Sequence, residues 1–190
     1  NFGDVLFPLI IAREISVRIP SAKIEFITPT GTSWSGMESI RLDQIQLASF
    51  DAILLGGGEI VHRYDSMLVD IYSRFGLRCM DQPTDLVFSW TKTNGPFKAW
   101  FAIGVPPLTP DAATAIFDAA HGLDFIGVRG SHSAQRISES TNHLSKVSTS
   151  PDLGWLFPRL LENHKADFTH PANGCPYIAV QSLGFSNLES

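Results

Sequence analysis

The chain has 190 residues, of which 44% are hydrophobic and 17% charged, and its formal net charge is −5. This length suffices for one ordinary domain with a hydrophobic core. The acidic balance and the lack of any Lys/Arg cluster argue against a nucleic-acid partner. No apolar run approaches the roughly 20 residues of a membrane span, and no signal peptide is visible. We therefore expect a protein without a transmembrane segment, located in the cytoplasm or at the inner face of the membrane.

The first half of the chain begins with a predicted amphipathic helix over residues 5–19, with Asp4 as its N-cap. Residues 23–27 alternate as a strand does, and residues 42–48 have the spacing of a short helix. A buried strand over residues 52–55 runs directly into three glycines. We further predict a helix over 66–75, ended by Gly76, and a loop with one helical turn over 78–97.

The second half alternates strands with helices more regularly. Thr109 is the predicted cap of a helix that has Pro110 at its first position and one apolar face. The remaining predictions are strands over 98–103, 125–128 and 146–149, helices over 131–138 and 155–162, a linker over 163–176 and a fresh strand over 176–181. This alternation predicts an α/β fold with a Rossmann-like parallel sheet and helices on both faces.

Both ends of the sequence favour a piece of a longer protein. A strand is expected before Asn1, because a sheet protein rarely opens on the turn that follows a strand. The strand over 176–181 is expected to open a second domain. We therefore assign residues 1–165 to an N-terminal Rossmann-like domain, and residues 166–190 to a linker and the start of a truncated C-terminal domain. The oligomeric state is not predicted.

Cysteines and histidines give no sign of a metal site. Cys79 and Cys175 are far apart and form no CxxC pair, which favours unpaired thiols over a disulfide. The six histidines form no HxH or HExxH motif, and no Cys/His cluster exists. We therefore predict no metal and no cofactor.

Polar or glycine-rich residues follow several of the predicted strands. Gly56, Gly57 and Gly58 lack a Cβ, so their backbone could approach a ligand and present N–H groups to an anion. A tight turn against a neighbouring strand explains them equally well. Their pattern is neither GxGxxG nor GxxxxGK[ST], so neither nucleotide fingerprint applies. Because ligands bind beyond the carboxyl ends of strands in open α/β sheets, these strand ends predict one shared cleft.

Three further positions could serve that cleft. Arg129 follows an apolar strand and could hold a carboxylate or phosphate through two parallel hydrogen bonds, or form a structural ion pair. Ser131 or Ser133 could cap the next helix or touch the same anion. Asp152 is either a polar strand end that faces the cleft or a helix cap, and Asp4 is either a cap or also a general base.

Taken in order, these segments resemble the polysaccharide pyruvyl transferase family. The matching pieces are Asn1-Phe-Gly-Asp4, Asp51-Ala-Ile-Leu-Leu-Gly-Gly-Gly58, Gly127-Val-Arg129-Gly-Ser-His-Ser133 and Pro151-Asp152. The resemblance implies one half of a GT-B-like two-domain architecture. It also implies transfer of the enolpyruvyl group of phosphoenolpyruvate to two hydroxyls of a sugar or lipid-linked saccharide, giving a pyruvate ketal in exopolysaccharide or cell-wall glycan synthesis.

The resemblance also implies roles for individual residues. Asp4 would take the proton of a sugar hydroxyl, while Arg129 and the glycine turn would hold the anionic donor. The substrate-binding set is Asn1, Gly3, Gly56, Gly57, Gly58, Glu59, Arg129, Ser133 and Asp152. The chain departs from the family at Gly130, where an acidic residue is usual, and at Glu59, where an apolar or small residue is more common. The C-terminal domain that brings basic residues to the donor is expected outside this sequence.

Two other functions fit the same strand ends. One is a GT-B glycosyltransferase that uses a nucleotide sugar, whose donor site would lie in the second domain. The other is a non-catalytic α/β binding module that has kept the glycine turn, and Gly130 gives it some support. Binding of phosphoenolpyruvate against binding of a nucleotide sugar separates the three functions.

Overall fold

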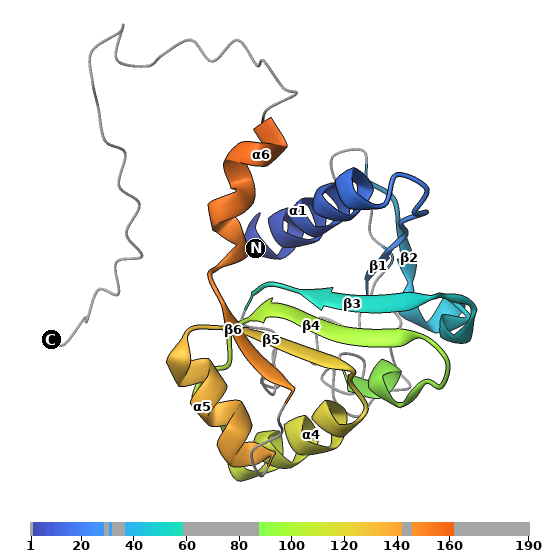
Figure 1. The fold of residues 1–190 in the computed structure, drawn as a ribbon. Helices are drawn as coiled ribbons and strands as arrows, with labels where there is room; N and C mark the ends of the chain where they lie inside the picture. Colours follow the sequence, from blue (N-terminus) through green and yellow to red (C-terminus); the bar gives the residue numbers. More distant parts are fainter. Residues whose placement is uncertain (1, 29–30, 32–36, 59–87, 142–145, 162–190) are drawn as a thin grey trace, which may run out of the picture.

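The computed structural model describes residues 2–28, 31, 37–58, 88–141 and 146–161. Its main element is a parallel sheet of β3 (Ala52–Gly56), β4 (Phe97–Ile103), β5 (Phe125–Arg129) and β6 (Val147–Ser150), in that spatial order (Figure 1). Each of these strands agrees with a predicted strand to within one residue. The helix over 66–75, the loop over 78–87, and the linker and strand beyond residue 162 lie outside the described residues.

Helices cover both faces of this sheet, as the alternating pattern predicts. Helix α1 (Phe2–Arg18) lies on one face, while α4 (Pro110–His121) and α5 (Ser131–Ser140) lie on the other (Figure 1). A 3₁₀ turn, η4 (Leu153–Leu156), and the short helix α6 (Phe157–Leu161) follow β6 and pack against α1. Within the described ranges, no helix is long and apolar enough to cross a membrane.

The core lies between the sheet and the layer formed by α4 and α5. Strand β4 has a partner on each side, so its sequence is an almost continuous apolar run. Trp100 is fully buried and packs with Phe88, at 5.9 Å between ring centroids. Ile116 of α4 and Ile137 of α5 are fully buried in the same cluster. Burying each such isoleucine contributes roughly 1.5–3 kcal/mol to folding.

Two helix starts differ from the sequence-based expectation, and one agrees with it. Thr109 caps α4 as predicted, because its side chain accepts a hydrogen bond from the Ala112 N–H at 3.3 Å. Helix α1 begins at Phe2, so Asp4 lies inside its first turn and the predicted N-cap at Asp4 is wrong. Helix α5 is preceded by Gly130, which makes no side-chain cap, so neither of the two nearby serines caps it.

The segment before β3 also departs from the prediction. The residues expected to form one helix over 42–48 form two separate 3₁₀ turns, η1 (Leu42–Gln44) and η2 (Leu47–Ser49). Ile45, between them, has extended backbone angles (φ −114°, ψ 140°) that break the helix. The predicted strand over 23–27 shortens to β1 (Phe26–Thr28), because its parallel partner β2 (Ser39–Arg41), which sequence analysis missed, pairs only with those residues.

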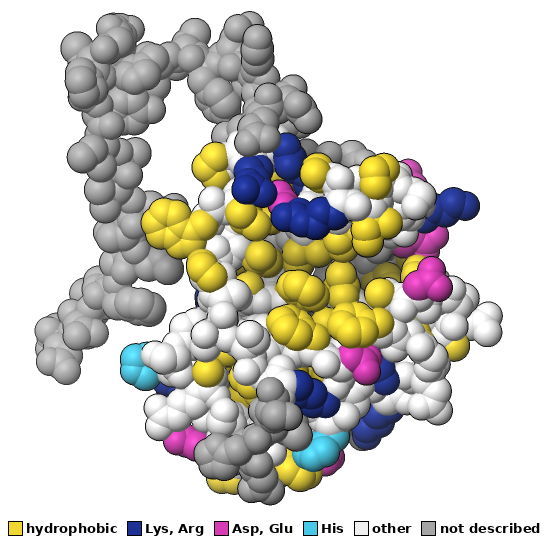
Figure 2. All heavy atoms as spheres, in the orientation of Figure 1, with side chains coloured by type: hydrophobic (Ala, Val, Ile, Leu, Met, Phe, Trp, Pro, Cys, Tyr) yellow, Lys and Arg dark blue, Asp and Glu magenta, His cyan; other side chains and the backbone are white. Residues whose placement is uncertain are grey.

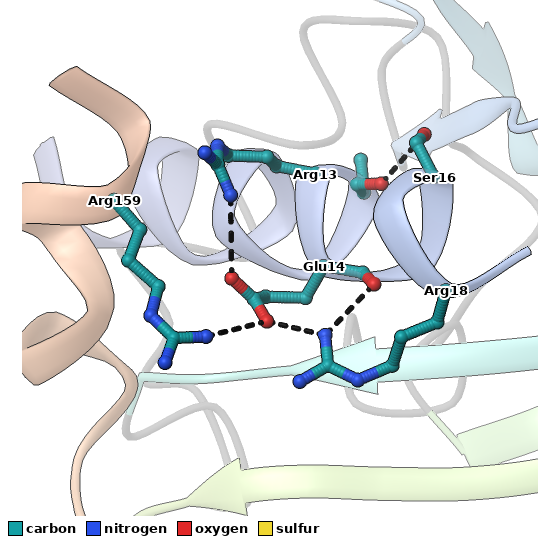
Figure 3. Close-up of polar contacts among 6 residues, drawn as sticks. Arg13, Glu14, Ser16, Arg18 and Arg159 are labelled. Carbon is teal, nitrogen blue, oxygen red and sulfur yellow. Dashed lines mark hydrogen bonds and ion pairs between the residues drawn. The ribbon is translucent and has the colours of Figure 1, made fainter. Parts of the chain in front are cut away.

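A cluster of arginines around Glu14 connects α1 to α6 (Figure 3). Arg13 lies 3.5 Å from one carboxylate oxygen of Glu14, and Arg159 of α6 lies 3.3 Å from the other. Arg18 pairs with that second oxygen, one helical turn further along α1. The hydrogen bond from Arg18 is the largest of the effects that hold the pKa of Glu14 below its usual value of 4.5, and partial desolvation opposes it.

Glu14→Gln should lower the free energy of unfolding at pH 7 by about 1 kcal/mol, because it leaves the arginines around an uncharged group. A carboxyl whose pKa is lowered on folding contributes stability above its unfolded pKa and loses it as the pH falls through the folded pKa. The difference between the two proteins should therefore be constant above about pH 4.5 and shrink below it. Urea unfolding at several pH values measures this, with the exposed Glu25→Gln as control. A difference that persists at pH 2 would exclude the charge as its cause.

Candidate functional site

The carboxyl ends of all four strands lie along one edge of the sheet. The strands pair in parallel, with Gly56 opposite Phe101 and Arg129 opposite Ser150. This confirms the expectation that the glycine turn and Arg129 share an edge. The beginning of α1 lies over the same edge, next to the ends of β3 and β4 (Figure 1). The edge is where open α/β sheets bind their ligands, and we call it the carboxyl edge.

The glycine turn, Gly56–Gly58, is joined to the end of β4 by backbone hydrogen bonds. Gly57 and Gly58 are both buried and have positive φ angles of 71° and 73°. The Gly57 N–H donates to the carbonyl oxygen of Phe101 at 2.8 Å, and the Gly104 N–H donates to the carbonyl oxygen of Gly58 at 2.7 Å. These bonds continue the pairing beyond the end of β3. The Gly57 amide is therefore engaged within the fold instead of being presented to an anion.

The same glycines allow α1 to approach the sheet. A Cβ added to Gly57 would lie 2.1–2.4 Å from three atoms of the Phe7 side chain, and one added to Gly56 would lie 1.9 Å from the Ile11 Cδ1 atom. Real Cβ atoms essentially never come within 3.0 Å of another atom in this way. The close contact holds the second and third turns of α1 against the glycine turn, and the first turn, with Gly3 and Asp4, directly precedes it. Asn1, Glu59 and the Asp4 side chain lie outside the described part of the structure.

Arg129 and Asp152 form an ion pair at the carboxyl edge. An Arg129 Nη1 donates to Asp152 Oδ2 at 2.6 Å, and both side chains are about one-third exposed. The other carboxylate oxygen, Oδ1, accepts a hydrogen bond from the Gly154 N–H at 2.7 Å, so Asp152 also caps η4. The structural ion pair that the sequence allowed for Arg129 and the helix cap that it allowed for Asp152 are therefore both present. Neither removes the pair from the edge, where a guanidinium and a carboxylate remain in reach of solvent.

Gly130 shapes the turn between Arg129 and α5. Its backbone angles, φ 78° and ψ 160°, belong to a region that residues other than glycine hardly enter. A Cβ placed there would meet nothing within 4 Å, so the requirement for glycine is conformational and not steric. An acidic residue would need a different turn here.

Ser133 lies inside the fold, although sequence analysis placed it among the substrate-binding residues. It is buried, and its hydroxyl accepts a hydrogen bond from the Val105 N–H at 3.1 Å. Arg136, one turn further along α5, donates to the carbonyl oxygen of Val105. Ser133 and Arg136 together fix both polar groups of the Val105 backbone. They hold the segment that follows β4 against α5, a role that their i, i+3 spacing on one helix face could have indicated.

An irregularity in β4 lies just before that segment. Its pairing with β5 shifts register between Trp100 and Ile103, and Ala102 has a positive φ of 49°. Bulges of this kind bend a strand and re-aim the residues after it, and they are frequent beside active sites. Nothing in the sequence marks Ala102 for this conformation. Among the described residues, no group of three or more His, Cys, Asp or Glu side chains could hold a metal ion.

Comparison with known families decides the class of this protein. A family model for polysaccharide pyruvyl transferases matches residues 1–184. The chain belongs to this family. The resemblance drawn from the short motifs is thereby confirmed, and the family indicates a transferase of polysaccharide biosynthesis. Comparisons with curated proteins and with solved structures find no match.

Gly57→Ala should destabilise this pyruvyl transferase family member strongly. The added methyl must displace Phe7, and the positive φ adds strain, so the combined cost is roughly 2–5 kcal/mol. Gly95→Ala is the matched control, because Gly95 also has a positive φ, 109°, but open space around its Cβ position. Its cost should be only the strain, about 1–2 kcal/mol. Thermal unfolding compares the two. Equal shifts in Tm would mean that the contact with α1 is not what requires glycine.

Proposed function

We propose that this protein transfers the enolpyruvyl group of phosphoenolpyruvate to two hydroxyls of a saccharide and so forms a pyruvate ketal. Both sugar oxygens bond to the central carbon of the donor, and the bond from that carbon to the phosphate oxygen breaks. One hydroxyl proton ends on the methylene carbon, which becomes a methyl group, and the other leaves with inorganic phosphate. The reaction is balanced without a redox step, so it needs no electron-carrying cofactor.

The observation that carries this proposal is the position of Arg129. It extends from the end of β5 at the same edge as the glycine turn and the first turn of α1. The donor has a phosphate and a carboxylate, which a planar guanidinium binds through paired hydrogen bonds. The beginning of α5, directly after Gly130, adds the positive end of a helix dipole near the same place. Preorganised donors of this kind stabilise negative charge that develops on the leaving phosphate.

Asp4 is proposed as the general base. Its backbone lies in the first turn of α1, and Phe7, one turn further on, contacts the glycine turn. The beginning of α1 lies over the carboxyl edge, where the donor is proposed to bind. Helix position and catalysis are compatible, because an acidic residue in a first turn also interacts favourably with the helix dipole. Pro8 has no N–H to donate to the Asp4 carbonyl, so the helix lacks one of its usual hydrogen bonds there.

Arg129→Lys should impair use of the donor. Lysine can keep an ionic contact with Asp152, but a point charge cannot replace the planar fork. The loss of one charge-assisted hydrogen bond corresponds to roughly 1.5–3 kcal/mol, which is about ten- to a hundredfold or somewhat more in kcat/KM for phosphoenolpyruvate. Steady-state kinetics of the full-length protein measure it, and Arg159→Lys in α6 is the control. Unchanged donor kinetics would leave Arg129 with a structural role only.

Asp4→Asn should preserve the fold and reduce turnover by roughly 10²–10⁴-fold, because an amide cannot accept the proton of the sugar hydroxyl. The fold should lose at most about 1 kcal/mol from the helix-dipole interaction. Both kcat and Tm are measured on the full-length protein with phosphoenolpyruvate and a saccharide acceptor, with Asp51→Asn at the opposite end of β3 as control. A stable Asp4→Asn protein with full turnover would exclude Asp4 as the base and make Glu59 the next carboxylate to test.

The alternative function is that of a glycosyltransferase that uses a nucleotide sugar as its donor. Titration of the full-length protein with phosphoenolpyruvate, and separately with a panel of nucleotide sugars, distinguishes the two. Saturable binding of phosphoenolpyruvate with release of phosphate in the presence of saccharide supports the proposal. Binding of a nucleotide sugar alone would replace it.

A further inference from the structure

Trp155 is exposed at the carboxyl edge, in the turn that Asp152 caps. Its side chain is 80% exposed, more than the next most exposed large hydrophobic residue of the described chain, Val17 at 62%. Tryptophan is highly buried on average in folded proteins. Within the described residues, Trp90 and Trp100 follow that rule, at 5% and 0% exposure. In the described part of the chain, Trp155 therefore presents its indole to solvent and not to the hydrophobic core.

The backbone around Trp155 is held by the same residue that binds Arg129. The Trp155 N–H donates to the Asp152 carbonyl oxygen at 3.2 Å, and the Gly154 N–H donates to the Asp152 carboxylate. A Cβ on Gly154 would lie 3.0 Å from that carboxylate oxygen, so the turn is tightly closed. The indole is thus attached to a fixed turn, a few residues from the ion pair. A rigidly mounted aromatic ring loses little conformational freedom when it binds a ligand.

We propose that Trp155 is the stacking platform for the pyranose ring of the saccharide acceptor, an inference that rests on the proposed function. A pyranose has faces lined by C–H groups and a rim of hydroxyls. The indole can cover a C–H face, and the Asp152 carboxylate can accept hydrogen bonds from the rim, because an ionised carboxylate has about four acceptor positions. Two of these are occupied, by Arg129 and by the Gly154 N–H. The acceptor would then lie beside the guanidinium that is proposed to hold the donor.

The other exposed large hydrophobic side chains of the described residues do not combine these features. Phe97 is 46% exposed, but it lies at the start of β4, at the end of the sheet opposite to Arg129. Figure 2 shows that hydrophobic side chains also gather between α1 and the sheet. Phe97 therefore serves as the matched control, an exposed aromatic residue remote from the carboxyl edge.

The test uses Trp155→Ala, Trp155→Phe and Phe97→Ala in the full-length protein. Because Trp155 is exposed, its replacement should leave Tm unchanged within about 1–2 °C. An aromatic stacking contact supports an effect of roughly three- to tenfold. Trp155→Ala should raise the KM for the saccharide by that factor, with the KM for phosphoenolpyruvate unchanged. Trp155→Phe should recover most of the loss, and Phe97→Ala should behave as the unmodified protein.

A binding measurement separates this inference from the proposed function. Methyl hexopyranosides at millimolar concentration should protect the tryptophan fluorescence of the unmodified protein from acrylamide quenching, and protection should disappear in Trp155→Phe. If no saccharide supports transfer but this protection is seen, the proposed reaction fails while Trp155 remains a sugar platform. If transfer occurs and Trp155→Ala has an unchanged saccharide KM, or raises the KM of both substrates equally, the inference is overturned. Absence of protection by every glycoside also overturns it.

Discussion

The architecture of the carboxyl edge depends on Gly56 and Gly57, which have no Cβ atom. Because neither has a Cβ, α1 lies directly on the end of β3 through Phe7 and Ile11. Helix α1 in turn supports α6 through Glu14 and Arg159, and it packs against η4. The turn that carries Asp152 and Trp155 is therefore positioned by contacts that begin at the glycines. Three segments distant in sequence meet at one edge through this series of contacts.

At the carboxyl edge, the Asp152 carboxylate both stabilises the η4 turn and pairs with Arg129, the residue proposed to bind the donor. One oxygen of Asp152 fixes the η4 turn and the other meets Arg129. Directly after the arginine, this chain has Gly130 in a conformation that other residues hardly adopt. The carboxylate beside the guanidinium is that of Asp152, two residues beyond the end of β6. The orientation of Arg129 is thereby tied to the far strand of the sheet and, through η4, to α1.

The sequence predicted the parallel sheet well, because each of its strands is an apolar run bounded by turn residues and tertiary packing only confirms that local preference. The sequence-based prediction failed where the local preference is weak, or where pairing with a neighbouring strand decides whether a strand forms. Ile45 breaks a helix that its neighbours favour, and β2 exists because β1 is beside it. At the site, the shared position of the glycine turn and Arg129 could be predicted from topology alone, because the carboxyl ends of parallel strands lie at the same edge of a sheet. The burial of Ser133 and the exposure of Trp155 could not, because both depend on how helices pack against the sheet.

The topology also sets an order in which the chain can fold. Strands β4, β5 and β6 are joined by crossovers through α4 and α5, whereas β3 reaches β4 only through residues 57–96. Closing a longer connection costs more chain entropy before any pairing compensates for it. The unit from β4 to β6 is thus expected to form first, and β3 and α1 to join it afterwards. In this order the part of the carboxyl edge formed by β3 and α1 is assembled last, and amide hydrogen exchange should find the hydrogen bonds that join β3 to β4, such as that of Gly57, among the first to open.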